Sequence, residues 1–434
     1  MQVVRILQRT AVAGFGRLQK RTRSGAQSRS VAKATDALAV PATGVYVHLP
    51  FCRRRCFYCD FPIQVVGDSP NAPAGMITYV DAVCKDIATR QAASISEGRL
   101  ETVFFGGGTP SLLPPAQLSR ILDALDLRFG ISADAEVSLE CDPGTFDSNR
   151  LREYLALGVT RISLGVQSFD ETMLRVCGRA HNAQDARSAV EIVRESSVRS
   201  WSLDLISGLP NLTPALWDDT LDAAIAAAPH HLSVYDLQVE DKTAFGRWYT
   251  PGVAPLPSEE QAAGMYVTAH HTLQAAGFQH YEVSNFAVAG HKCRHNLRYW
   301  SDAEWHAFGL AAANNLGGQR FTRPRRMAEY LAWVADGCAT PALVSAKATD
   351  AEEALQDCLM LGLRLVDGVR IPDLRARFGD DAVARVLAAA QPAVDDGLML
   401  ADEHHLRLAA PRGFLVSTSV LADLFANMER RRAS

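Results

Sequence analysis

The stretch Cys52-Arg53-Arg54-Arg55-Cys56-Phe57-Tyr58-Cys59 places three cysteines within eight residues, shortly after the apolar run Val45–Leu49. Three thiols on one loop can bind a common metal centre, and thiolates are the soft ligands that iron–sulfur clusters require. Three protein ligands on a four-iron cluster leave one iron open, and an open coordination position marks a reactive metal site. The spacing therefore predicts a [4Fe–4S] cluster on Cys52, Cys56 and Cys59.

A zinc site is the alternative interpretation of the same cysteines. Zinc prefers four ligands, commonly arranged as two C-x₂-C pairs, and no second pair lies nearby in the sequence. The chain has nine cysteines, an odd number of which only these three cluster. This pattern does not suggest a secreted disulfide framework and favours a reducing compartment.

Short apolar runs alternate with stretches of helical period after residue 43. The runs have the length of buried strands: Val45–Leu49, Thr102–Phe105, Glu136–Glu140, Arg161–Val166, Ser202–Ile206 and His231–Leu237. The helical stretches are Ile77–Ala93, Pro115–Leu127, Ser148–Leu157, Ala183–Ser197, Ala215–Ala227 and Glu259–Ala276. Six such units predict parallel strands with helical crossovers. Because a closed barrel has eight, we expect an α/β fold with a partial (β/α)6 barrel, whose ligands bind at the C-terminal ends of the strands.

The two ends of the chain depart from this pattern. Residues 44–335 form the predicted core. Residues 346–425 predict a small helical or winged-helix-like C-terminal domain, with helices at Glu352–Arg364 and Ala382–Ala390 and strand-like segments at His405–Leu408 and Gly413–Ser417. Residues 1–43 hold eight basic side chains and one acid together with several serines, which is typical of an organelle transit peptide. A disordered basic tail is the alternative.

Composition and charge narrow the classes of function. The whole chain carries a formal net charge of −4, so residues 44–434 carry −11 once the basic start is set aside. An acidic body argues against nucleic-acid binding as the main task. No apolar run has the length of a membrane span. A transit peptide would direct the protein to an organelle matrix, with the mitochondrion favoured over a plastid; without one we expect the cytoplasm.

The C-x₃-C-x₂-C spacing resembles the radical S-adenosylmethionine (SAM) superfamily. The resemblance extends over nearly all of residues 44–420 and is closest to the oxygen-independent coproporphyrinogen III oxidase family, in its heme-chaperone (HemW-type) branch. It implies that SAM chelates the open iron through its amino and carboxylate groups. It also implies that an electron from the reduced cluster cleaves SAM to a 5′-deoxyadenosyl radical.

The same resemblance assigns SAM-binding residues. Tyr46, in Tyr46-Val47-His48-Leu49-Pro50-Phe51-Cys52, matches a tyrosine that contacts SAM, and Tyr58 matches an aromatic near adenine. Gly106-Gly107-Gly108-Thr109-Pro110 resembles the glycine-rich SAM turn, which implicates Gly107, Gly108 and Thr109. Further matches are Glu140, Gln167, Arg179 and Asp204. An acid can bond the ribose hydroxyls or the ammonium of SAM, and an arginine can pair with its carboxylate.

A second motif, His295-Asn296-Leu297-Arg298-Tyr299-Trp300, resembles the H-N-x-x-Y-W signature of the heme-chaperone branch. The resemblance implies a heme site at His295, Asn296, Tyr299 and Trp300. An imidazole is a chemically suitable axial iron ligand, and an aromatic pair can pack on a porphyrin face. The alternative is a structural histidine among core aromatics. His291 and His306 are rival ligands.

Two departures from the oxidase branch bear on the function. Phe61 stands where that branch has a fourth cysteine, and the N-terminal segment resembles a transit peptide instead of a folded lid. In addition, Phe308–Leu316 carries alanines and no histidine where the family has a glycine-rich run. Phe61 and the His295–Trp300 motif favour a radical SAM heme chaperone that binds heme, passes it to client hemoproteins and takes electrons from a donor for its cluster. The alternatives are oxygen-independent oxidation of coproporphyrinogen III and a radical SAM reaction on another substrate.

Overall fold

The computed structural model describes residues 42–67, 72–89, 98–317, 319–338, 344–345 and 351–433. Its central element is a nine-stranded sheet with the order β11-β1-β4-β5-β6-β7-β8-β10-β9. The six middle strands run parallel and are β1 (Gly44–Leu49), β4 (Leu100–Gly107), β5 (Ile131–Cys141), β6 (Arg161–Gln167), β7 (Ser200–Ser207) and β8 (His231–Asp236). These six strands confirm the predicted partial barrel.

Three further strands extend the sheet beyond the six predicted units. β11 (His306–Phe308) pairs in parallel with β1, while β10 (Asn285–Ala287) and β9 (Gln279–Glu282) add antiparallel strands beyond β8. The sheet curves without closing, because β11 and β9 lie at its two edges.

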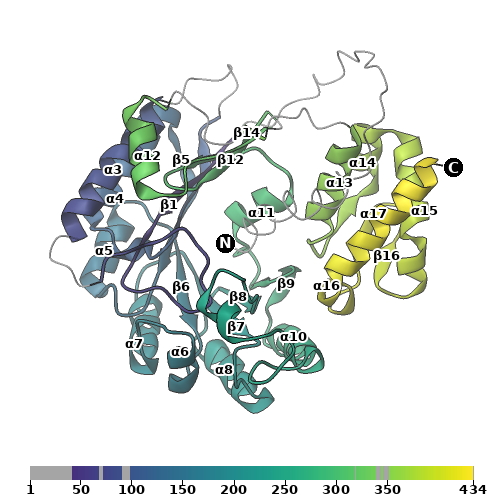
Figure 1. Ribbon diagram of the computed structural model, residues 1–434, viewed down its shortest axis with the longest axis horizontal. Helices are drawn as coiled ribbons and strands as arrows, with labels where there is room; N and C mark the ends of the chain where they lie inside the picture. Colours follow the sequence, from purple (N-terminus) through teal and green to yellow (C-terminus); the bar gives the residue numbers. More distant parts are fainter. Residues whose placement is uncertain are drawn as a thin grey trace.

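Helices cover the outer face of the sheet (Figure 1). They are α3 (Ala72–Thr89), α4 (Pro115–Phe129), α5 (Ser148–Ala156), α6 (Glu171–Val176), α7 (Ala183–Arg194), α8 (Pro214–Ala226) and α10 (Glu259–Ala275). Side-chain caps define several of their starts. Asp147 accepts a hydrogen bond from the Arg150 amide at the start of α5, and Asn182 and Asp185 form a capping box on α7. Such caps satisfy backbone donors that the first turn leaves open.

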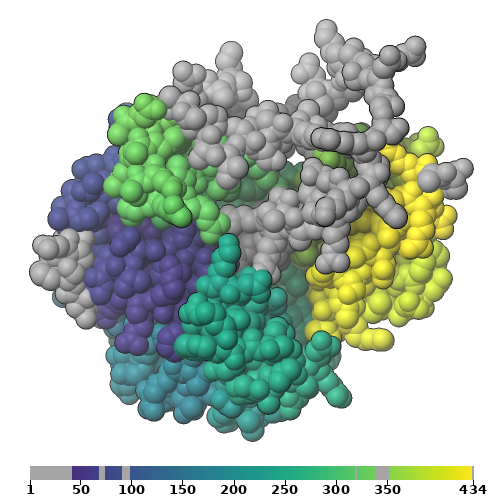
Figure 2. All heavy atoms as spheres, viewed as in Figure 1, coloured from purple at the N-terminus to yellow at the C-terminus, as the bar shows by residue number. Residues whose placement is uncertain are grey.

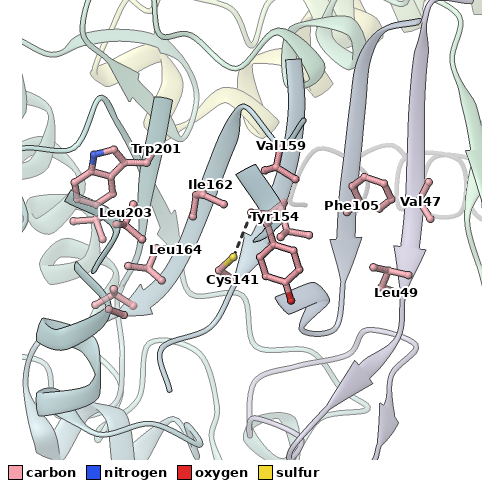
Figure 3. Close-up of a cluster of buried hydrophobic side chains, with 14 of the residues drawn as sticks. Val47, Leu49, Phe105, Cys141, Tyr154, Val159, Ile162, Leu164, Trp201 and Leu203 are labelled. Atoms are coloured by element: carbon pink, nitrogen blue, oxygen red, sulfur yellow. Dashed lines mark hydrogen bonds between the residues drawn. The ribbon is translucent and has the colours of Figure 1, made fainter. Parts of the chain in front are cut away.

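The side chains of the strands alternate between two buried faces. Val47, Leu49 and Phe105 point outward into the apolar layer beneath the helices, together with Ile162 and Leu164 (Figure 3). The alternate positions point into the barrel and carry polar or aromatic groups, as at Tyr46, Phe104, Glu140 and Asp204. Parallel strands that are covered on both faces show this pattern. The inner face is therefore where the chemistry of the barrel lies.

The C-terminal region has a hydrophobic core of its own. It comprises α13 (Ala351–Gly362), β15 (Val369–Arg370), α14 (Ile371–Phe378), α15 (Asp380–Asp395), β16 (Met399–Ala401), β17 (His405–Leu408), α16 (Arg412–Leu415) and α17 (Ser417–Ala433). Figure 2 shows these elements as a lobe beside the barrel. The strand expected at Gly413–Ser417 is wrong. Of the apolar residues 414–416 only Phe414 is buried, while Leu415 and Val416 are exposed, and this segment begins in the short helix α16.

Smaller strands and helices occupy the connections of the barrel and the segment that leads to the C-terminal region. β2 (Phe51–Cys52) pairs with β3 (Gln64–Val65), and β12 (Ala313–Leu316), β13 (Gln319–Thr322) and β14 (Val344–Ser345) form a small sheet. The remaining helices are η1 (Pro110–Leu112), α9 (Ala244–Trp248), α11 (Arg294–Trp300) and α12 (Met327–Ala335). α11 lies between the barrel and the C-terminal helices (Figure 1). No helix in the described ranges has the length and apolarity to cross a membrane. The predicted transit peptide and residues 346–350 lie outside the described residues, apart from 42 and 43.

Candidate functional site

A pocket opens at the C-terminal ends of the barrel strands and brings together almost all the residues predicted for the cluster and SAM. Its lining includes Cys52, Cys56, Tyr58, Cys59, Gly107, Gly108, Thr109, Glu140, Gln167, Arg179 and Asp204. These residues come from the cysteine loop, from the C-terminal halves of β4, β5, β6 and β7 with the turn after β4, and, for Arg179, from the connection between α6 and α7. The structure therefore places segments that are more than a hundred residues apart around one cavity, at the end of the barrel where parallel-strand folds bind ligands.

The cysteine loop is held at both ends by backbone pairing. Cys52 lies opposite Val65 in the β2–β3 pair, and the Thr109 amide donates to the carbonyl of Phe51 at 2.7 Å. The guanidinium of Arg55 donates to the carbonyls of Cys59 and Phe61. These bonds fix where the three thiols emerge, because they tie the loop to β3, to the glycine-rich turn and to itself.

The donor set of this loop suits an iron–sulfur cluster. Burial raises the pKa of the Cys52 thiol to about 12, and metal binding would supply the positive charge that stabilises its thiolate. Among the described residues no three His, Cys, Asp or Glu side chains gather around a single ion. A four-iron cluster takes one thiolate per iron, so thiols spread around a cavity meet its requirement. Cys52, Cys56 and Cys59 would hold it.

The glycine-rich turn requires glycine because other parts of the protein lie very close to its backbone. Gly107 has φ +125°, and a Cβ there would lie 2.7 Å from the His48 ring. A Cβ on Gly108 would lie 2.6 Å from the carbonyl oxygen of Phe51. The Gly107 amide donates to Glu140 at 3.0 Å. The turn therefore connects the cysteine loop to the acidic side of the pocket through backbone atoms.

Two buried carboxyl groups form that acidic side. Burial, with a smaller contribution from the nearby carboxylate of Asp204, raises the pKa of Glu140 to about 7. Burial also raises the pKa of Asp204, against hydrogen bonds from Ser233, Ser163 and Ser202 that lower it. A cationic group or hydroxyl donors placed between these acids would offset their desolvation. The ammonium and the ribose hydroxyls of SAM are such donors.

The opposite wall is basic and contains unsatisfied polar atoms. One Arg179 nitrogen donates to Asp142 at 2.6 Å and to the Gly165 carbonyl at 2.8 Å, and the other approaches the Cys56 sulfur at 3.4 Å. The Arg179 Nε and the Gln167 amide oxygen are buried without a hydrogen-bond partner among the described residues. Gln167 also has φ +68°, which is uncommon for a residue with a side chain. Unpaired buried groups facing a cavity are what a polar ligand would satisfy.

Sequence reasoning missed several residues of this pocket. Asp142 forms an ion pair with Arg179. It lies just after the Glu136–Glu140 strand, but its residue type and position alone did not single it out. Ser163 and Ser202 donate to Asp204 at 2.9 and 3.2 Å. Their positions on the inner face follow from the two-residue period of the strands, a signal that was available in the sequence.

Tyr46 differs from the other predicted SAM residues because it does not line the pocket. Its ring is buried below the pocket and stacks on Phe104, and its hydroxyl lies 3.0 Å from the His48 imidazole. Burial raises its pKa. Between Tyr46 and Phe104 a Cβ on Gly106 would have no room. In this structure Tyr46 therefore supports the floor of the pocket from beneath, while contact with SAM stays a prediction.

The H-N-x-x-Y-W motif forms α11 at the opposite end of the barrel. His295, Asn296, Tyr299 and Trp300 are all buried, and none lines the pocket. The His295 ring nitrogens are 2.9 Å from the Thr102 hydroxyl and 2.9 Å from the Tyr299 hydroxyl. Burial lowers the pKa of His295 to about 3. Both imidazole nitrogens are hydrogen-bonded inside the core, so an iron would have to displace one of these bonds.

The two rival histidines lie in different surroundings. His306 is buried on β11 against Phe129, with ring centroids 4.6 Å apart. His291 is half-buried, stacks on His230 at 4.3 Å and bonds Ser200 through Nδ1 at 3.0 Å. Among these three histidines, His291 is the one whose ring reaches the surface.

The run Phe308–Leu316 departs from the family pattern but is firmly anchored. The Gly309 amide donates to Asp86 at 3.3 Å, and Asp86 also forms a buried ion pair with Arg323 at 2.6 Å. None of these residues lines the pocket. The alanines of the run Phe308–Leu316 therefore belong to an apolar layer beside β11 and do not alter the wall of the pocket.

Comparisons with known proteins agree with this architecture. Residues 46–224 match the model of the radical SAM superfamily, and residues 349–416 match that of the HemN C-terminal domain. The structure shares its fold with coproporphyrinogen III oxidase (HemN) from Escherichia coli, with a TM-score of 0.76 and 24% sequence identity, over 89% of this chain and 90% of that one.

Sequence relatives place the chain more narrowly. It is 41% identical over 409 residues to "Heme chaperone HemW" of Synechocystis, covering 89% of this chain and 97% of the relative. It is also 32% identical to the bovine "Radical S-adenosyl methionine domain-containing protein 1, mitochondrial", covering 93% of each chain. Identity at this level over nearly the whole length shows common membership, and the chain therefore belongs to the HemW family of the radical SAM superfamily.

Proposed function

We propose that this protein is a heme chaperone that binds heme and passes it to client hemoproteins. The observation that carries this proposal is the 41% identity over 97% of a relative named as a heme chaperone. In addition, the pocket contains every residue predicted for the cluster and all those predicted for SAM except Tyr46. We propose that Cys52, Cys56 and Cys59 hold a [4Fe–4S] cluster and that SAM occupies the cavity beside it.

The side chains of the pocket define how SAM would be oriented. Glu140 and Asp204 are placed to accept hydrogen bonds from its ammonium or ribose hydroxyls, while Arg179 and Gln167 face it from the other wall. When reduced, the cluster would supply the electron that cleaves SAM. Arg179 is paired with Asp142, so a SAM carboxylate would share or displace that partner.

Phe61 supports the chaperone proposal over the oxidase alternative. Its side chain lines the pocket where the oxidase branch has a fourth cysteine. We expect the cluster-loaded protein to leave coproporphyrinogen III unconverted when supplied with SAM and a reductant without oxygen. Product analysis by chromatography tests this, and robust formation of protoporphyrinogen IX would replace the chaperone proposal with the enzyme.

Hemin titration of the reconstituted protein tests the proposal directly. We expect saturable binding and transfer of the heme to apomyoglobin as a model client. His295→Ala, His291→Ala and His306→Ala identify the axial ligand, since loss of that imidazole shifts the Soret band. If His295 is the ligand, its imidazole must first give up its hydrogen bond to Thr102 or to Tyr299, and hemin will bind slowly. Absence of saturable binding by the wild-type protein would refute the proposal.

We also propose an organelle location, in the mitochondrion by preference. The basic, serine-containing residues 1–43 and the mitochondrial name of the bovine relative support it. A fluorescent protein fused behind residues 1–43 should enter the organelle, whereas a fusion to residues 44–434 should remain outside. Import into plastids, or no import, would correct this proposal without affecting the heme assay.

A further inference from the structure

The surface of the cysteine loop is basic although the body of the protein is acidic. Arg53, Arg54 and Arg55 are three consecutive exposed residues. Arg55 is occupied by the loop carbonyls, but within the described chain no hydrogen bond or ion pair is found for Arg53 or Arg54. Arg53 and Arg54 are thus unpaired cations beside the cysteines, and both also line the pocket.

A second segment adds charge and an exposed aromatic ring to the same surface. The Phe245 amide in α9 donates to the Phe57 carbonyl at 3.0 Å, so α9 is fastened to the cysteine loop. The Trp248 ring lies edge-on to Phe57 at 4.9 Å and is 54% exposed. Val65, opposite Cys52 in the β2–β3 pair, is 47% exposed. In Figure 2 the purple and teal parts of the chain meet on the face that is shown.

The charge of this surface contrasts with that of the whole. Residues 53–60 and 241–248 together hold five basic and two acidic side chains, whereas residues 44–434 carry a net charge of −11. An acidic protein would be repelled by most of the surface and attracted to this region. Tryptophan and arginine are also among the residues that most often dominate the binding energy at protein interfaces.

We propose that Arg53, Arg54, Trp248 and Val65 form the docking surface for a small acidic electron-carrier protein that reduces the cluster. This proposal rests on the cluster proposed above. The carrier loses one electron and the cluster gains it, so no proton or further reactant is needed. Because Cys56 and Cys59 lie on the same loop and are only half-buried, docking here would bring the carrier's redox centre close to the acceptor.

The test uses the full-length, cluster-loaded protein and a reduced plant-type [2Fe–2S] ferredoxin as the acidic probe. Affinity is measured by calorimetry, and electron transfer by stopped-flow bleaching of the cluster. Arg53→Glu/Arg54→Glu should weaken binding and slow transfer by about tenfold or more at low salt, since two attractive charges become repulsive. The difference should shrink at high salt, where exposed charges are screened.

Trp248→Ala separates apolar contact from charge. It should weaken ferredoxin binding at both salt concentrations, because no charge is changed. Arg430→Glu/Arg432→Glu, a double reversal of exposed arginines at the end of α17, is the matched control and should bind ferredoxin as wild type does. Iron content and the fraction of cluster reduced by dithionite, which needs no docking, normalise every sample.

The docking surface and the chaperone function would be refuted by different results. Unchanged ferredoxin affinity and transfer in both loop and Trp248 variants would refute the docking surface. Weaker hemin binding in Arg53→Glu/Arg54→Glu with unchanged ferredoxin binding would make this region a site for heme carboxylates instead. If wild type fails to bind hemin while ferredoxin docking depends on these residues, the chaperone proposal fails and the docking surface stands.

Discussion

The two ends of the barrel hold the two predicted sites in contrasting states. At the C-terminal ends of the strands, an open pocket is lined by half-buried thiols, two desolvated acids and an unpaired glutamine oxygen. At the N-terminal ends, α11 is buried in the core. His295 is hydrogen-bonded through both ring nitrogens, and Trp300 is 1% exposed. The pocket proposed for the cluster and SAM is therefore already open in the structure, whereas a heme site at α11 would require the core to open.

Loss of the cluster is the largest effect expected at the open end. Cys56→Ser should abolish cluster loading, because a hydroxyl is a poor substitute for a soft thiolate. Iron content and visible absorption after anaerobic reconstitution measure it. Cys84→Ser is the control, since Cys84 lies on α3 away from the pocket. Full loading of Cys56→Ser would show that the open pocket is not the cluster site.

At the closed end, Trp300→Ala should reduce the free energy of unfolding by about 3–5 kcal/mol, the usual cost of removing a large buried aromatic. Chemical denaturation measures this loss. Trp248→Ala, which removes an exposed ring, should cost less than about 1 kcal/mol. A small effect at Trp300 would contradict the view that α11 is part of the core.

His295 should make stability depend on pH in a defined direction. Its folded pKa of about 3 lies below the ordinary value of 6.5, so only the unfolded chain binds this proton between those values. Stability from this group is therefore complete above pH 6.5 and falls by about 1.4 kcal/mol per pH unit below it. The difference between wild type and His295→Gln should shrink as the pH is lowered from 8 to 5. Parallel curves would show that His295 is not held neutral in the core.

A further effect at the open end concerns the affinity for SAM. Gln167→Ala and Asp204→Ala should each weaken SAM binding by about 1–3 kcal/mol, the range for a hydrogen bond to a charged group. Calorimetry on the cluster-loaded variants measures it. Gln184→Ala, on the exposed side of α7, is the control. Unchanged affinity in both pocket variants would mean that SAM binds elsewhere.

The sequence predicted the open end better than the closed one, for physical reasons. Cys52 and Gln167 each end a strand, and Asp204 lies in the C-terminal half of β7. Parallel strands bring such positions to one edge whatever their side chains pack against. The depth of His295 depends on Thr102 and Phe104, which lie far away in the sequence and on another strand. A short motif carries no information about such partners.

Two further differences have the same origin. The two-residue period of the strand correctly places Tyr46 on the inner face. It does not predict how far below the pocket the ring lies, because that depth is set by the stack with Phe104 and the bond to His48. The segment 241–258 reads as a loop rich in glycine and proline, yet it contains α9, whose Phe245 is buried against the cysteine loop. Both features arise from contacts between distant segments.

The pairing of β9 with the C-terminal region has a consequence for solubility. Beyond β9 the sheet is continued by the chain that follows α13, through a bridge between Glu282 and Leu365 and the bond from the Val283 amide to the Arg364 carbonyl at 3.1 Å. An uncovered edge strand offers its backbone donors and acceptors to any passing strand. A protein cut after residue 345 would expose this edge, so we expect it to self-associate through strand pairing, and the C-terminal domain to keep the barrel monomeric.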